Sequence, residues 1–134
     1  MIRILVVSSL FLCSPFALGS AYFECIVKES LTLNSDGILT SNPNGIWPQK
    51  NDKFIVDSDT GKILGNSISN TKPTGKLMLE KGTRDGDYYR VVTLHSLKYH
   101  IDYLEIRIDK NKKSHPFIYK DSYSHILSGI CNDE

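Results

Sequence analysis

Alternating apolar and polar positions dominate the chain from Tyr22 to Cys131, in short runs rich in Tyr, Phe, Ile and Val. A period of two residues is typical of half-buried β-strands, and the helical period is nearly absent. We therefore predict a β-rich domain with strands at residues 22–28, 30–33, 37–40, 53–57, 62–64, 76–80, 88–96, 99–108, 116–119 and 124–130.

Clusters of Asn, Asp, Ser, Thr, Lys and Gly separate these runs, among them residues 34–37, 57–61, 84–87 and 109–112. Such clusters supply residues that tolerate the backbone dihedrals of tight turns, so each predicts a hairpin. Successive hairpins predict an all-β fold built as a small antiparallel meander. A meander hides its edges by closing into a barrel or by folding into a sandwich, and we favour the barrel.

The first residues have the order of a secretory signal peptide: Arg3, an apolar run over 4–18, then small residues up to Ala21. The run spans about 15 residues, whereas a membrane-spanning helix needs roughly 20. We predict a signal peptide over residues 1–21, with cleavage after Gly19 as the alternative. The product would be exported, to the periplasm or outside the cell.

The cysteines predict a disulfide in the mature domain. Cys13 lies in the leader and would be removed with it, so residues 22–134 keep Cys25 near their start and Cys131 near their end. An even count in a small exported domain indicates a bridge, which here would link the first strand to the last. Closing a loop of about 100 residues contributes up to about 4.7 kcal/mol in the chain-entropy model.

Charge narrows the class of partner. Removal of Arg3 with the leader leaves equal numbers of basic and acidic residues. A neutral chain gives no reason to expect nucleic acid or an anionic membrane as partner. The asparagines form no Asn-x-Ser/Thr sequon, which favours a bacterial envelope location.

Two longer polar stretches, residues 41–51 and 65–75, interrupt the strand pattern. Binding residues concentrate on loops that a rigid scaffold positions, so these stretches are the candidate contact regions. The candidate contact residues in them are Asn44, Trp47, Asn66 and Asn70.

Catalytic patterns fail on spacing. Ser67 stands in an incomplete nucleophile elbow, because Ser69 replaces the second glycine and no helix follows. Asp102 and Glu105 are an odd number of residues apart on a predicted strand, which places them on opposite faces. A disulfide between the two mature cysteines leaves no thiol nucleophile. No catalytic residue is predicted.

Metal-binding patterns fail in the same way. The segment 57–61 has the alternating acids of a calcium loop, but Gly61 and Ile68 stand where that loop needs oxygen ligands. On one extended strand, His95 and His100 would point to opposite faces. His115 and His125 lie beside predicted turns. We therefore predict neither a metal nor a cofactor.

Three resemblances bear on function. The start Tyr22-Phe23-Glu24-Cys25, with a partner cysteine at the far end, resembles the layout of periplasmic lysozyme inhibitors of the membrane-bound/C-type family. That resemblance implies a small antiparallel barrel that inserts a loop into the lysozyme cleft, although the inhibitory loop of that family has no counterpart in this sequence.

The segment 53–57 followed by 60–65, with the closing Ser128-Gly129-Ile130-Cys131, is similar to small uncharacterised exported proteins of Gram-negative bacteria. This similarity implies an envelope location. Gly45-Ile46-Trp47 resembles the Gly-x-Trp of lipocalin-like barrels, which bind small apolar ligands in the barrel mouth.

From these observations we expect a non-catalytic, inhibitor-like module that binds an envelope or extracellular protein. The tyrosines of the C-terminal half fit either ordinary sheet packing, which we favour, or a binding face. A lipocalin-like carrier of a small ligand is the first alternative. A hydrolase without a recognisable motif is the second.

Overall fold

The computed structural model describes residues 21–43, 47–70, 75–81, 88–95 and 100–134. The predicted signal peptide, Cys13 included, lies outside the described residues except for Ala21. The described chain is all-β, as predicted, and its strands are β1 (Tyr22–Leu33), β2 (Leu39–Ser41), β3 (Lys53–Asp57), β4 (Ile63–Gly65), β5 (Gly75–Lys81), β6 (Tyr88–His95), β7 (His100–Arg107), β8 (Ser114–Lys120) and β9 (His125–Asp133). The described ranges hold no helix long and apolar enough to cross a bilayer.

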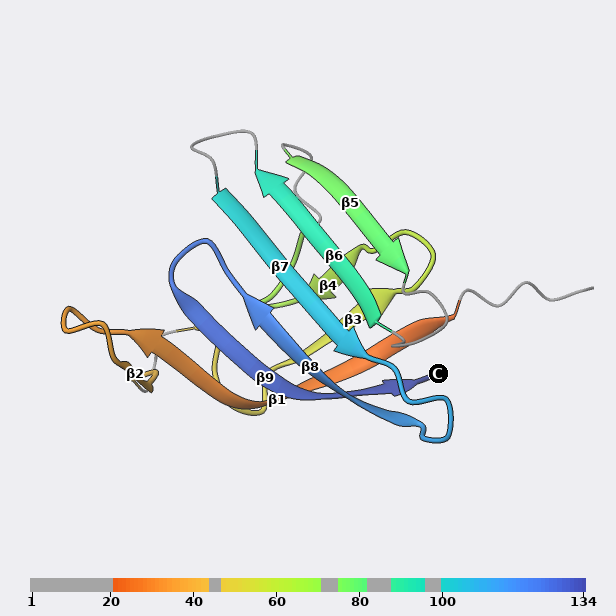
Figure 1. Cartoon of the computed structure of the whole chain (residues 1–134), viewed down its shortest axis with the longest axis horizontal. Coiled ribbons are helices and arrows are strands. Elements are labelled where there is room, and N and C mark those ends of the chain that lie inside the picture. Colours follow the sequence, from red (N-terminus) through yellow and green to blue (C-terminus); the bar gives the residue numbers. More distant parts are fainter. Residues whose placement is uncertain (1–20, 44–46, 71–74, 82–87, 96–99) are drawn as a thin grey trace, which may run out of the picture.

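All strands belong to one antiparallel sheet with the order β4-β3-β1-β9-β8-β7-β6-β5, and β2 pairs with the far part of β1. Strands β5 to β9 form the expected meander, in which each strand pairs with the next. The N-terminal strand then enters beside the C-terminal one, so β1 and β9 lie at the centre of the sheet (Figure 1).

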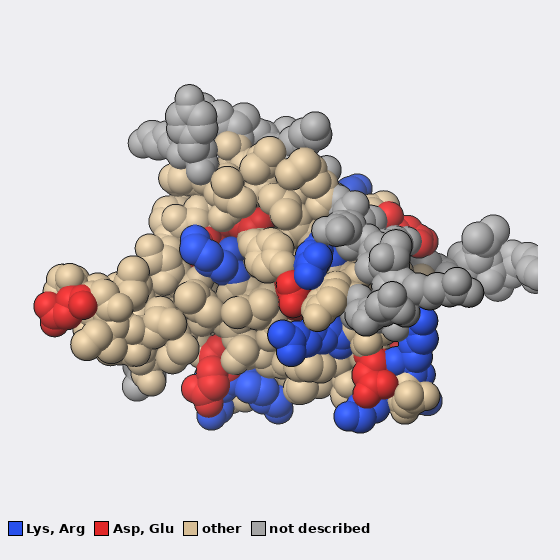
Figure 2. All heavy atoms as spheres, viewed as in Figure 1, with Lys and Arg blue, Asp and Glu red and all other residues tan. Residues whose placement is uncertain are grey.

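Strict alternation of burial explains why these segments form strands. In β8, His115, Phe117 and Tyr119 are buried, while Pro116 and Ile118 are exposed. The same alternation in the other long strands directs one set of side chains to the inner face of the sheet, where they form a single apolar core. The outer face carries interspersed basic and acidic side chains, as Figure 2 shows for one view of the molecule.

The sheet curls into a half-barrel, so that the β3–β4 hairpin lies behind the front strands (Figure 1). Phe54 of β3 meets Phe117 of β8 edge to face, with ring centroids 5.2 Å apart. Tyr89 Oη of β6 donates a hydrogen bond to the Asp57 carbonyl at 2.9 Å. These contacts join strands that are not neighbours in the sheet, and they hold its two ends together across the core.

One irregularity changes a predicted boundary. The pairing of β1 with β9 shifts its register between Val27 and Glu29, which is a β-bulge. The two strands predicted at 22–28 and 30–33 are therefore one strand, β1. A bulge inserts an extra residue and bends the strand. Beyond it, the outer half of β1 stays paired with β9 on one side and pairs with β2 on the other.

The predicted disulfide joins Cys25 to Cys131. The two residues are direct partners in the β1–β9 ladder, and both are buried in the core. The bond therefore links the N- and C-terminal strands, as the cysteine spacing predicted.

Candidate functional site

An open pocket of about 580 Å³ lies at the end of the sheet where β6 and β8 finish and β7 and β9 begin. Both loops singled out from the sequence reach it, one through Trp47 and Pro48 and the other through Ser67 and Ser69. The remaining lining residues come from strand ends and the β8–β9 turn: His95, His100, Asp102, Tyr119, Asp121, Ser122, Tyr123 and His125.

Asp102 organises one side of the pocket. It is 7% exposed, and its Oδ1 accepts hydrogen bonds from the Ser122 amide at 2.8 Å and the Ser122 hydroxyl at 2.6 Å. Its Oδ2 lies 2.7 Å from His95 Nε2. Tyr119 also bonds this carboxylate, and burial, with Asp102 beside it, raises the pKa of Tyr119 above its ordinary value.

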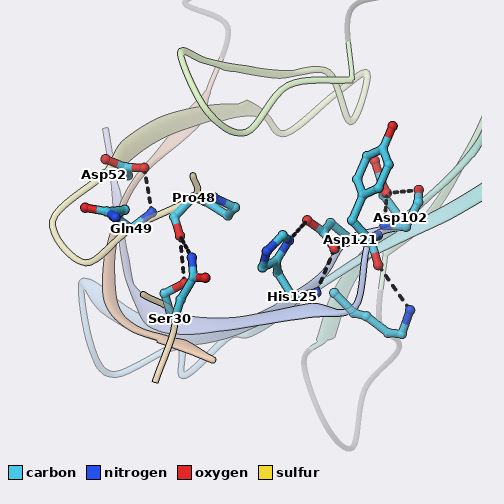
Figure 3. Close-up of polar contacts among 11 residues, drawn as sticks. Ser30, Pro48, Gln49, Asp52, Asp102, Asp121 and His125 are labelled. Carbon is cyan, nitrogen blue, oxygen red and sulfur yellow. Dashed lines mark hydrogen bonds and ion pairs between the residues drawn. The ribbon is translucent and has the colours of Figure 1, made fainter. Parts of the chain in front are cut away.

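Asp121 organises the other side in the same manner. Its Oδ1 accepts the backbone amides of Tyr123 and His125, each at 2.8 Å, which closes the β8–β9 turn. Its Oδ2 lies 2.6 Å from His125 Nδ1 (Figure 3). Ser124 completes the turn with a positive φ of 76°.

These pairs determine where the protons of the neutral imidazoles lie. An ionised carboxylate only accepts hydrogen bonds, so the facing ring nitrogen must donate. His95 then holds its proton on Nε2 and His125 on Nδ1, which leaves lone pairs on His95 Nδ1 and His125 Nε2. No hydrogen bond among the described residues takes either lone pair.

Two exposed aromatic side chains, Trp47 at 63% and Tyr123 at 73% exposure, stand on the lining of the pocket. The His100 ring meets Tyr123 edge-on, with centroids 5.5 Å apart. Large exposed aromatics beside a pocket are typical of binding sites, because they offer apolar area at low cost in conformational entropy.

Hydrogen bonds to the main chain hold the loop that carries Trp47 in place. The Pro48 carbonyl accepts hydrogen bonds from Ser30 Oγ at 2.7 Å and Asn42 Nδ2 at 2.8 Å (Figure 3). Pro48 is itself buried. Trp47 is therefore presented by a loop that is held against β1 through its main chain.

Asp52 ties the two pocket loops to each other. Its Oδ2 accepts hydrogen bonds from the Gln49 amide at 2.8 Å and from Ser67 Oγ at 2.6 Å. The candidate contact loops are thus one connected structure at the pocket, and no local sequence pattern indicates that they meet.

The four predicted contact residues have different fates. Trp47 lines the pocket, and Asn66 is exposed but is not among the lining residues. Asn44 lies outside the described residues. Asn70 is buried, with 9% of its surface exposed. Its side chain accepts the Ile63 amide at 2.6 Å and donates to the Gly61 carbonyl and Thr93 Oγ1, so it joins the β4 side of the sheet to β6.

The expectation that His95 and His100 point to opposite faces is wrong. They lie on two strands, β6 and β7, and are direct partners in that ladder, so both reach the same pocket. Facing residues of paired strands share a side of the sheet. The predicted strands 88–96 and 99–108 already placed the two histidines symmetrically about a turn, and that symmetry was the missed signal.

Asp102 and Glu105 do face apart, as predicted. Asp102 reaches the pocket, while Glu105 accepts hydrogen bonds from Arg90 at 3.1 Å and Tyr103 at 2.6 Å. The Tyr103 hydrogen bond, with Arg90 beside it, lowers the pKa of Glu105. Among the described residues, no group of three or more His, Cys, Asp or Glu side chains is arranged to hold a metal ion.

The serine chemistry of the pocket is also constrained. Ser122 Oγ donates a hydrogen bond to Asp102, and Ser67 Oγ donates one to Asp52. Both hydroxyls are therefore bonded to carboxylates and not to imidazoles. A serine nucleophile needs a base that takes its proton and is oriented in turn by a third group.

Comparison with family models, with characterised proteins and with solved structures finds no match for this chain.

Proposed function

We propose that this chain is an exported, non-catalytic binding module that recognises an envelope or extracellular protein through the pocket at the β6–β9 end of the sheet. The observation that carries the proposal is that two exposed aromatics, Trp47 and Tyr123, lie beside polar groups that internal hydrogen bonds already orient. A site that is ordered before binding loses little entropy when a partner docks.

The two alternatives have weaker support. A carrier needs an internal cavity, but the inner face of the half-barrel is filled by the apolar core, including Phe54, Phe117 and Leu127. A hydrolase needs a nucleophile activated by a base, and Ser122 is bonded to Asp102 instead. The Cys25–Cys131 disulfide is consistent with export, since such bonds persist in oxidising compartments.

The proposal is tested by capture from envelope and culture extracts with the oxidised protein as bait. Tyr123→Ala and Trp47→Ala should abolish capture of a saturable partner, because both side chains are exposed and their removal leaves the core intact. Tyr22→Ala is the matched control, since Tyr22 is an exposed aromatic at the opposite end of the β1–β9 pair.

Capture that survives both pocket variants would overturn the proposed surface. An absence of any saturable protein, together with a small molecule retained in native mass spectra, would instead favour the carrier.

A further inference from the structure

The charge of the pocket is one-sided. Asp102 and Asp121 both line it, and none of the described lining residues is a lysine or an arginine. The nearest lysine in sequence, Lys120, is exposed and donates to the Asp121 main-chain carbonyl at 3.1 Å. The described lining therefore holds two carboxylates and neither a lysine nor an arginine inside a partly enclosed space, which favours a cation.

The hydrogen-bonding groups have the same preference. Internal donors occupy the two carboxylates. These carboxylates orient His95 and His125, and the second ring nitrogen of each histidine has no hydrogen-bond partner among the described residues. At His95 Nδ1 and His125 Nε2, a group that enters the pocket therefore meets acceptors, and it must bring donors to bond them. Ammonium and guanidinium groups are donors only.

The aromatic rim adds a third preference. Trp47 and Tyr123 offer exposed rings beside the negative base. A cation over the face of such a ring gains about 0.5–1 kcal/mol at an exposed site, and more when it is desolvated. Trp is the strongest partner of this kind.

We infer that the pocket receives a lysine or arginine side chain of the partner protein, with the cation between the aromatic rim and the two imidazole acceptors. This inference rests on the proposed function, and it names the chemistry of the partner residue. The indole and phenol rings would contact the side chain, and His95 Nδ1 and His125 Nε2 would accept its hydrogen bonds.

The experiment uses Trp47 as its reporter, because it is the only tryptophan of the chain. The oxidised protein is titrated with acetyl-Gly-Arg-Gly-amide, with its lysine analogue, and with the neutral citrulline and acetyl-lysine counterparts. Trp47 fluorescence and its indole N–H resonance are followed. We expect saturable binding of the cationic peptides and at least about tenfold weaker binding of the neutral ones.

Two variants localise the effect. Tyr123→Ala should weaken arginine-peptide binding about fivefold through loss of the cation–π contact. Asp36→Asn removes an exposed carboxylate in the turn before β2 and should change nothing.

Equal binding of the citrulline peptide would overturn the inference, and so would saturable binding of a neutral chitin trisaccharide in place of the peptides. Silence towards every probe, while Tyr123→Ala still abolishes capture of a protein, would reject the cation and keep the proposed function. Loss of both results would reject the two together.

Discussion

His115 and His125 lie at opposite ends of the β8–β9 pair, and each is bonded to an aspartate. His115 is 1% exposed; its Nε2 lies 2.9 Å from Asp133 Oδ2, and its Nδ1 accepts the Asp109 amide at 3.2 Å. His125 uses Nδ1 for Asp121, and its ring lines the pocket with Nε2 unbonded among the described residues. Both ring nitrogens of His115 are hydrogen-bonded, whereas His125 is oriented through Nδ1 and keeps Nε2 open to the pocket.

The surroundings of the two histidines differ in the same sense. At the His115 end, the Phe23 ring packs against the imidazole, and His115 pairs with Cys131, whose disulfide to Cys25 links β9 to β1. At the His125 end, polar pairs and exposed aromatics replace apolar packing. One end of the sheet is closed by packing and a disulfide, and the other holds oriented polar groups that line an open pocket. The same residue pair, His–Asp, serves either purpose according to how many of its atoms are already satisfied.

The largest expected effect is the loss of the disulfide at the His115 end of the sheet, which we call the closed end. Replacing Cys25 and Cys131 together by alanine should lower the free energy of unfolding by about 4–5 kcal/mol, because the bond closes a loop with a sequence separation of 106 residues. Urea unfolding of the wild type with and without reductant, beside the double variant, measures it. A midpoint unaffected by reduction would show that apolar packing alone holds this end.

A methyl group at the strand contact of the closed end should be nearly as damaging. A Cβ at Gly129 would overlap the Ile26 carbonyl oxygen and crowd the Phe117 ring. Gly129→Ala should therefore cost about 3 kcal/mol, the upper part of the range for overpacking. Ser128→Ala, an exposed neighbour on the same strand, is the control for thermal unfolding, and comparable melting temperatures of the two variants would contradict the contact.

The two histidines themselves provide the direct comparison. His115→Ala should cost about 2–3 kcal/mol, because it leaves a cavity and removes the acceptor of the partly buried Asp109 amide. His125→Ala should cost only about 1 kcal/mol, since water in the open pocket can replace the bond to Asp121. Denaturant unfolding of both variants tests this order, and equal losses would mean that the pocket is as much a part of the core as the closed end.

The smallest effect concerns the link between β6 and β3. Burial, with Asp57 nearby, raises the pKa of Tyr89 above its ordinary value. Above about pH 10 the unfolded chain ionises this phenol and the native protein does not, so stability falls as pH rises past that point. Tyr89→Phe should cost about 1 kcal/mol at neutral pH and reduce that alkaline loss. Stability measured at neutral pH and near pH 11 checks it; an unchanged alkaline slope would be the contrary result.

Much of the fold could be predicted from local chemistry. The Asn, Asp and Gly clusters located turns, and alternation located strands, because both signals are carried by adjacent residues. The bulge at Val27 and Glu29 escaped detection because neither residue is unusual in a strand. The cysteine pair indicated that β1 and β9 are linked. It could not show that the two strands lie at the centre of the sheet, because a disulfide does not determine strand order.

The candidate site was predicted in part. Trp47 lies on the pocket lining, and a tryptophan in a polar loop is conspicuous in the sequence. Nothing local in the sequence shows that the Asn70 amide is buried against Thr93. The His–Asp pairs differ in their visibility. Asp121 and His125 are four residues apart and bracket a turn, whereas His95 and Asp102 come together only once the β6–β7 register is known.

The disulfide also has a consequence for the connectivity of the chain. Because Cys25 and Cys131 lie near the two ends of the folded region, the bond makes everything between them a covalent ring. A protease that cuts one loop of this ring opens it without releasing a fragment, so a nicked molecule keeps its mass apart from one added water. In denaturing gel electrophoresis such a molecule would run as a single band without reductant and as two bands with it. Both pocket loops lie between the two cysteines, so a cut in either loop would leave the two parts of the chain joined.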